Sequence, residues 1–414
     1  MRRTESGMPD FDYACALMDT LHAQIQKGNV NYCQVVEEGG SAVAVMQSCF
    51  GEGVGFDFAS IGADSFTPNL GDLLVSATDI TAFDEYDTSY YGITTADGKV
   101  SLGGDISDYI TAFTGTLEKN FRTTAPASGE APVLAYADRV KATVKTKVAK
   151  PKVFIPVFPG TNCEYDTARA FEKAGGEADI FVIRNRTASE IDESVEEIVK
   201  RINSAQILMF PGGFSGGDEP DGSGKFIATT FRNGKIADAV HNLLDNRDGL
   251  ILGICNGFQA LVKTGLLPGG KISVQGATSP TLTFNNIARH VSQIVTTKVA
   301  SVKSPWLAGV NVGDVYGVAV SHGEGRFVAT EEDLKLLASN GQIATQYCDL
   351  SGNATMQSPF NPNGSMYAIE GITSLDGRIF GKMGHTERAG ANLYKNVEFD
   401  YDMKLFESGV KYFK

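Results

Sequence analysis

Hydrophobic residues follow two different patterns along this chain, and the change between them divides the sequence. Residues 11–27 carry apolar side chains at helical spacing and end at Gly28, which predicts an amphipathic helix. Short apolar runs at 41–47 (SAVAVMQ) and 72–78 (DLLVSAT) each predict a strand. The first part of the chain is therefore expected to be a small α+β domain.

Beyond residue 150, strand-like and helix-like segments alternate. The predicted strands are 152–158 (KVFIPVF), 178–184 (ADIFVIR), 206–213 (QILMFPGG) and 249–254 (GLILGI), and the predicted helices are 163–174, 189–203 with a Ser cap, and 233–245. Uncharged strands that alternate with helices are typical of a doubly wound, mostly parallel sheet. In such sheets ligands bind at the carboxyl ends of the strands, where glycine-rich turns fall here.

A basic segment, RVKATVKTKVAKPK at 139–152, separates the two patterns. Its charges alternate with small and apolar residues, so it is either a solvated linker or a binding patch, and the linker is favoured. We expect an α+β domain over 1–135, a linker over 136–150 and an α/β domain over 151–414.

Composition narrows the class of protein. The 414 residues include 36 Lys+Arg and 49 Asp+Glu, a net charge of −13, which disfavours binding to nucleic acid or an anionic membrane surface. Six scattered cysteines without a CxxC or Cys/His cluster predict neither a disulfide framework nor a structural metal site. No apolar run reaches a membrane span or forms a signal peptide, so we expect a cytoplasmic protein.

The pentapeptide GICNG (253–257) is the most informative motif. A buried strand precedes Cys255 and a helical pattern follows it, with glycine two residues before and after. This is the nucleophile-elbow layout with sulfur in place of oxygen. The helix N-terminus would lower the thiol pKa and offer N–H groups to an oxyanion. The alternative is a buried structural cysteine at a strand end.

A cysteine nucleophile needs a base, and His385 is the best candidate among five histidines. It follows a predicted strand (RIFGKM), and Glu387 lies two residues later, on the same side if the backbone is extended. Glu387 would fix the imidazole tautomer, which completes a Cys–His–Glu triad. His22 and His241 are expected to be packing or surface residues, and no catalytic role is predicted for His290.

The turn after QILMF supplies the third element of the site. A backbone N–H near Gly213 and Phe214 is expected to face a developing oxyanion, with the Asn256 N–H as second donor. A further glycine-rich segment, GEGVGF at 51–56, fits no phosphate-loop pattern and is interpreted as a turn after a helix.

Together these motifs resemble the class I (triad) glutamine amidotransferases, and more narrowly the glutaminase domain of phosphoribosylformylglycinamidine synthases. The motifs are GICNGFQ (253–259), PGGFS (211–215), VSHGEGR (320–326), GHTER (384–388), FNNIARH (284–290) and the 154–176 segment. The resemblance implies that Cys255 attacks the glutamine side-chain amide, with His385 and Glu387 as partners and no cofactor. It implies that Gln259 and the backbone of Ser321 and His322 hold the amino-acid end. Thr386 stands where the motif often has proline.

The first half resembles the end of the synthetase region of the same enzymes, an AIR synthase-like domain, through 35–58 and 106–123. The resemblance implies a carbon–nitrogen ligase of purine biosynthesis with glutamine as amido donor. Its ATP and Mg²⁺ would belong to synthetase lobes that this chain largely lacks, so a synthetase partner is expected.

Two alternatives stay open at this point. The chain could serve as the glutaminase of another synthetase, or as a catalytically silent scaffold with the same α/β fold. The PGGFSGGDEPDGSGK and SHGEGR segments weigh against the first, and the complete set of triad residues weighs against the second.

Overall fold

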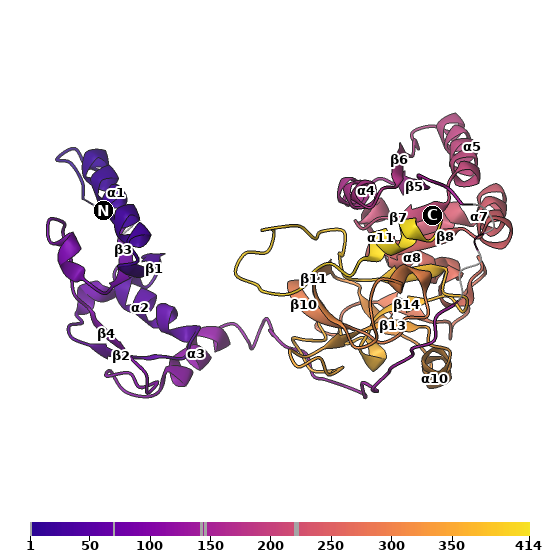
Figure 1. Cartoon of the computed structure of the whole chain (residues 1–414). Coiled ribbons are helices and arrows are strands. Elements are labelled where there is room, and N and C mark those ends of the chain that lie inside the picture. Colours follow the sequence, from indigo (N-terminus) through magenta and orange to yellow (C-terminus); the bar gives the residue numbers. More distant parts are fainter. Residues whose placement is uncertain (1, 69–70, 141–143, 145–146, 219–222) are drawn as a thin grey trace. The chain divides into compact units, whose positions relative to one another are not determined.

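Two compact units, Met1–Arg122 and Thr123–Lys414, make up the chain (Figure 1). The computed structural model describes residues 2–68, 71–140, 144, 147–218 and 223–414.

The first unit is α+β. Its helices are α1 (Phe11–Gln26), α2 (Gly40–Phe50) and α3 (Ile106–Gly115), and its strands are β1 (Val30–Val35), β2 (Gly55–Phe58), β3 (Leu73–Ala77) and β4 (Gly92–Thr95). Strand β1 pairs with β3, and β2 with β4, both antiparallel. The segment GEGVGF begins with a turn directly after α2 and ends in the first two residues of β2, so its interpretation as a turn after a helix is confirmed.

The prediction of a strand at 41–47 is wrong, because this segment lies inside α2. Its buried side chains recur at helical spacing, at Ala42, Val45, Met46 and Cys49. From local sequence alone, a short run of small and apolar residues is compatible with a strand or a helix. The structure has a helix here, because a helix places these apolar side chains on one buried face.

The second unit is built on a nine-stranded sheet in the order β11-β10-β13-β14-β15-β8-β7-β5-β6. Its strands are β5 (Lys152–Val157), β6 (Glu177–Val182), β7 (Ile207–Phe210), β8 (Leu250–Ile254), β10 (Val291–Val299), β11 (Val315–His322), β13 (Ile343–Cys348), β14 (Ile369–Thr373) and β15 (Ile379–Lys382). Strands β9 (Thr281–Thr283) and β12 (Arg326–Val328) form a separate pair. Strands β6, β5, β7, β8 and β15 run parallel, which confirms the predicted α/β sheet. The other pairs, from β15 to β11, are antiparallel.

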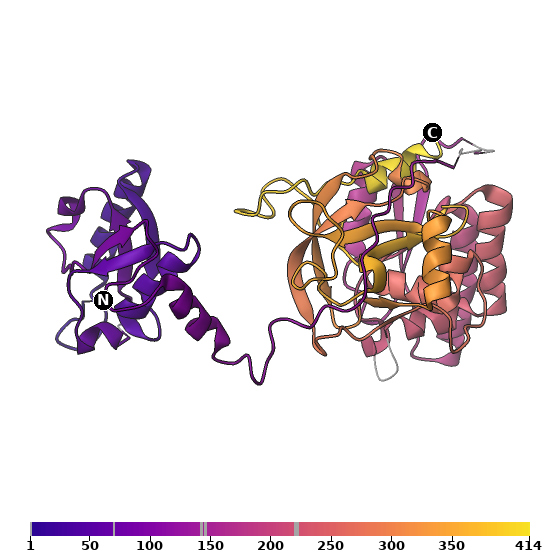
Figure 2. The same ribbon diagram turned by 90° about the horizontal axis from the view of Figure 1, so that it is seen from below.

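Helices cover this sheet and connect its parallel strands. They are α4 (Glu164–Lys173), α5 (Ala188–Ser204), α6 (Lys225–Phe231), α7 (Gly234–Arg247), α8 (Asn256–Thr264), α9 (Leu266–Gly269), α10 (Glu331–Ser339) and α11 (Leu405–Lys411). Helix α5 packs beside α7 (Figure 1), and α6 packs beside α8. The cap of α5 is Thr187, whose hydroxyl accepts from the Glu190 N–H, and not the predicted serine. A loop drawn in yellow extends from the unit before the chain enters α11 (Figure 2).

Some described residues of the predicted linker, which belongs to the second unit, form hydrogen bonds with the rest of that unit. The Tyr136 N–H donates to the Ala300 carbonyl at 2.9 Å, and the Arg139 guanidinium donates to the Leu307 and Val310 carbonyls. Residues 141–143 and 145–146 of this segment lie outside the described residues. None of the helices described is both long and apolar enough to cross a bilayer.

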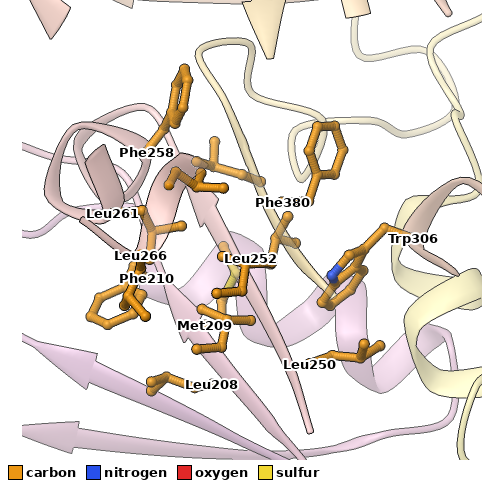
Figure 3. Packing of buried hydrophobic residues seen from close by; sticks show 14 of the residues in the cluster. Leu208, Met209, Phe210, Leu250, Leu252, Phe258, Leu261, Leu266, Trp306 and Phe380 are labelled. Atoms are coloured by element: carbon orange, nitrogen blue, oxygen red, sulfur yellow. The ribbon is translucent and has the colours of Figure 1, made fainter. Parts of the chain in front are cut away.

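The core of the second unit surrounds β7 and β8, whose residues are all buried. Leu252 lies between Met209 on β7 and Phe380 on β15, with which it is paired across the sheet (Figure 3). Continuous apolar strands of this kind are buried on both faces. This packing holds the carboxyl ends of the parallel strands in a common plane.

Replacing Leu252 with Ala is expected to lower the free energy of unfolding by about 3–5 kcal/mol, because a fully buried side chain leaves a cavity. The matched control Leu336→Ala, at a 55% exposed position on α10, should cost less than about 1 kcal/mol. Denaturant unfolding followed by the fluorescence of Trp306, the single tryptophan, measures both. Equal losses in the two variants would contradict this view of the core.

Candidate active site

Four loops that follow parallel strands of the second unit bring the candidate residues together. Cys163 follows β5, Gly213 follows β7, Cys255 follows β8 and His385 follows β15. A Cβ atom built on Gly212 would lie 2.8 Å from His385 Cε1, 3.1 Å from Cys163 Sγ and 3.4 Å from Cys255 Cβ. The structure therefore places both cysteine side chains and the imidazole around one glycine, at the strand ends where the sequence pattern predicts a site.

Cys255 occupies the sharp turn predicted for a nucleophile elbow. Its backbone has φ 52° and ψ −108°, a positive φ that is strained for a non-glycine residue. The flanking glycines are required by space, since a Cβ on Gly257 would lie 2.0 Å from the Phe210 carbonyl oxygen. The Cys255 N–H donates to the Lys382 carbonyl at 2.9 Å, and α8 begins at the next residue.

His385 and Glu387 form a buried pair, with Nδ1 2.6 Å from Glu387 Oε1. Glu387 holds Nδ1, so Nε2 is the ring nitrogen left to exchange a proton with a thiol. Burial by itself lowers the pKa of His385, but the Glu387 carboxylate and the Cys255 side chain, with hydrogen bonds to Cys163 and Cys255, hold it well above its usual range.

The predicted contact is present, but the predicted extended backbone is wrong. The segment after β15 is a tight turn, in which the Thr386 N–H donates to the Gly384 carbonyl at 3.1 Å. The Arg388 N–H donates to the His385 carbonyl at 3.2 Å. This turn brings Glu387 back onto the imidazole.

Cys163 is a neighbour of the site that the sequence reasoning missed. Its thiol donates to Asn162 Oδ1 at 3.1 Å, accepts from Arg388 Nη2 at 3.0 Å and lies 3.8 Å from His385 Nδ1. The sequence feature that could have indicated Cys163 is its position after a predicted parallel strand, as for Cys255.

Cys163, His385 and Glu387 offer sulfur, nitrogen and oxygen atoms within 4.8 Å of one another. Two ligands of a tetrahedral zinc ion would stand about 3.3 Å apart, farther than the 2.6 Å between His385 Nδ1 and Glu387 Oε1. The Arg388 guanidinium beside the thiol also opposes a cation. The geometry favours a hydrogen-bonded cluster over a metal centre.

The sequence predicts one oxyanion donor in the turn after β7, a backbone N–H near Gly213 and Phe214. The Phe214 N–H already donates to the Gly160 carbonyl at 2.8 Å, so it is not available to an oxyanion. For the Gly213 N–H, no acceptor appears among the described residues. Asn256 ties this turn to α8, because its Oδ1 accepts from the Ser215 N–H at 3.2 Å.

Both polar atoms of the Gln259 side-chain amide form hydrogen bonds with other groups of the protein. Oε1 accepts from Asn256 Nδ2 at 3.0 Å, and Nε2 donates to the Glu324 carbonyl at 2.5 Å. The Glu324 carboxylate in turn accepts from the Ser223 N–H at 2.7 Å. These hydrogen bonds connect the VSHGEGR segment with helix α8 and with the end of the glycine-rich turn.

Ser321 and His322 lie at the end of β11. The Cys255 thiol points at the Ser321 carbonyl, 3.8 Å away, and the Ser321 hydroxyl lies 2.9 Å from His290 Nε2. His322 is buried, with Nδ1 3.2 Å from Asn285 Oδ1. Burial, and then the neighbouring His290 and His385, lower the pKa of His322 to about 3, so its imidazole is neutral at physiological pH.

Comparisons with known proteins agree on one family. A family model described as a CobB/CobQ-like glutamine amidotransferase domain matches residues 150–413. The phosphoribosylformylglycinamidine synthase subunit PurQ of Methanococcus maripaludis is 39% identical over 257 residues, which cover 61% of this chain and 87% of that protein. The Aquifex aeolicus subunit of the same name is 34% identical over 244 residues, covering 58% and 92%. Among solved structures, one titled "Structure of PurLQS from Thermotoga maritima" is 26% identical, covers 64% of this chain and all of that chain, and has a TM-score of 0.47.

The neutral His322 predicts a loss of stability in acid. The unfolded chain protonates this residue near its ordinary pKa of 6.5, whereas the folded chain resists until about 3. Lowering the pH from 7 to 5 should therefore cost about 2 kcal/mol through His322 alone. His322→Gln should lack this component of the pH dependence, measured as unfolding free energy at both pH values. Because the variant changes only this ring, an unchanged pH dependence would contradict the assignment.

Proposed function

We propose that this chain, which belongs to the CobB/CobQ-like glutamine amidotransferases and to the family of the phosphoribosylformylglycinamidine synthase subunit PurQ, hydrolyses glutamine to glutamate and ammonia at Cys255. The observation that carries the proposal is the convergence of an elbow cysteine with a carboxylate-bound histidine at the carboxyl ends of neighbouring parallel strands. A silent scaffold would need neither the strained backbone of Cys255 nor the buried His385–Glu387 pair.

The reaction needs only the groups already described. His385 Nε2 takes the thiol proton as Cys255 sulfur attacks the amide carbon of glutamine, and the imidazolium then gives a proton to the leaving ammonia. Water hydrolyses the γ-glutamyl thioester with His385 as base and releases glutamate. Glu387 holds the tautomer and stabilises the imidazolium, in line with the raised pKa of His385.

The oxyanion of each tetrahedral intermediate is assigned to two backbone donors. These are the N–H of Gly213 and that of Asn256 at the start of α8, where the helix dipole adds positive charge. Ser321 and His322 border the same space with their backbone and are assigned to the amino-acid end of glutamine. Gln259 acts indirectly, because its amide braces Asn256 and Glu324.

The ammonia is proposed to serve a synthetase. The relatives are named as subunits of phosphoribosylformylglycinamidine synthase, which favours amide transfer in purine biosynthesis over service to another enzyme. ATP and Mg²⁺ are assigned to the partner. The glycine-rich turn at 51–56 follows a helix instead of opening one, so it offers no N-terminal phosphate cradle. We retain the AIR synthase-like origin of the first unit as a proposal.

A cytoplasmic setting is part of the proposal. All six cysteines are free, which fits a reducing compartment and a mechanism that depends on a thiol.

The test compares the two cysteines beside His385. Cys255→Ala should lower glutamate release from glutamine by more than about 10³-fold, because no other thiol lies on the elbow. Cys163→Ala removes a thiol on the Nδ1 side of the ring and should keep turnover within about tenfold of the unaltered chain. A glutamine-analogue electrophile should label the unaltered chain and Cys163→Ala, but not Cys255→Ala.

The outcomes separate three situations. Loss of labelling in Cys163→Ala with retention in Cys255→Ala would move the nucleophile to Cys163 and contradict the proposal. An unaltered chain with neither turnover nor labelling would contradict an active glutaminase. Labelling without turnover would support the site as an intact one that waits for its synthetase.

A further inference from the structure

Lys382 and Glu370 form an ion pair that the proposed reaction does not use. They lie on the neighbouring strands β15 and β14, with Nζ 3.3 Å from Oε1, and neither side chain is exposed at all. Taking two charges out of water costs more than their attraction commonly returns, so a buried pair of this kind is seldom explained by stability. Its contacts suggest another explanation.

Both members of the pair contact Gly384, the residue that precedes His385. Glu370 Oε1 accepts from the Gly384 N–H at 2.7 Å, while Lys382 Nζ donates to the Gly384 carbonyl at 3.3 Å. A side chain at position 384 would interfere, since a Cβ there would lie 2.9 Å from Glu370 Oε1 and 2.6 Å from Val318 Cγ2. The two charged side chains thus bind both the backbone N–H and the backbone carbonyl of Gly384.

The residue after His385 is held by the same lysine. Lys382 Nζ donates to Thr386 Oγ1 at 2.7 Å, and that hydroxyl also lies 3.8 Å from Met403 Sδ. Thr386 is the position where the family motif often has proline, which has no hydroxyl. Here the hydroxyl gives the buried ammonium an acceptor.

Lys382 also contacts the other half of the triad through its backbone. Its carbonyl accepts from the Cys255 N–H at 2.9 Å, across the parallel pairing of β15 with β8. One residue therefore touches the nucleophile through its carbonyl and both neighbours of the base through its ammonium. Glu370 is fixed in turn by the Thr345 hydroxyl, which donates to Oε2.

We propose that Lys382 and Glu370, with Thr386 as acceptor, are positioning residues that hold the turn carrying His385 in register with Cys255. The inference rests on the proposed glutaminase reaction and goes beyond it, because none of the three residues touches glutamine. Hydrogen bonds on both sides of His385 limit its shift along the turn, and an error of about 1 Å in a reacting group can cost about 100-fold in rate.

Thr386→Val tests the acceptor with little change in shape. It should lower kcat of the full chain about tenfold while KM for glutamine changes less than about twofold, because the base is displaced and the substrate contacts are not. Thr386→Ser restores the hydroxyl and should recover most of kcat. A purely structural role would not produce loss with valine and recovery with serine at equal folded fractions.

The double variant Lys382→Met/Glu370→Gln removes both charges together, which avoids leaving one buried charge unpaired. It should stay folded by Trp306 fluorescence, yet label Cys255 with a glutamine-analogue electrophile and turn over glutamine at least about tenfold more slowly. The matched control is Asp376→Asn/Arg378→Gln, which removes the 2.7 Å ion pair at the turn of the same β14–β15 hairpin. The control should keep kcat.

The outcomes distinguish this inference from the proposed function. Unchanged kcat and labelling in both Thr386→Val and the folded double variant would overturn the positioning role while leaving the glutaminase intact. Equal losses in the control pair would also overturn it, because any damage to the hairpin would then suffice. An unaltered chain that neither turns over glutamine nor reacts with the electrophile would overturn the proposed function, and the positioning role with it.

Discussion

The site depends on how closely the loops at the carboxyl ends of the strands can approach one another. At Gly212 the missing side chain leaves space in which the imidazole of His385 and the side chains of Cys163 and Cys255 meet, and any Cβ there would lie within 3.4 Å of an atom of each. The same constraint acts at the elbow, where Gly257 passes against the Phe210 carbonyl. Backbone geometry, set by a core that packs β7, β8 and β15 together, therefore decides which side chains can react.

Two buried histidines near this point show how the partner determines the charge. His385 has a carboxylate at 2.6 Å and its pKa is raised, whereas His322 has an amide at 3.2 Å and its pKa is lowered. Both rings lose most of their hydration, so burial acts on them in the same direction. At His385 the Glu387 carboxylate, with smaller contributions from Cys255 and Cys163, reverses the effect of burial. His385, which favours the charged imidazole, and His322, which favours the neutral one, can thus lie close together.

Much of the second unit could be predicted because its signals are local. The apolar runs of β5, β7 and β8, the glycines around Cys255 and the spacing of His385 and Glu387 are visible within a few residues. Other features depend on partners distant in sequence. The Phe214 N–H is taken by Gly160, and Cys163 lies beside His385 only after folding. The antiparallel half of the sheet follows long connections whose pairing no local pattern specifies.

Lys382 shows this limit at a single position. In the segment RIFGKMGH, a lysine near a strand end is expected to face water, because lysine is almost never fully buried without a partner. The partner, Glu370, lies on the preceding strand. The acceptors at Gly384 and Thr386 belong to a turn, whereas the sequence analysis predicts an extended segment there. Burial, charge and turn geometry must therefore be known together before the lysine can be connected with His385. The elbow and the His385–Glu387 pair could be inferred from motifs, whereas the contacts of Lys382 and Glu370 around His385 emerge only from the three-dimensional structure.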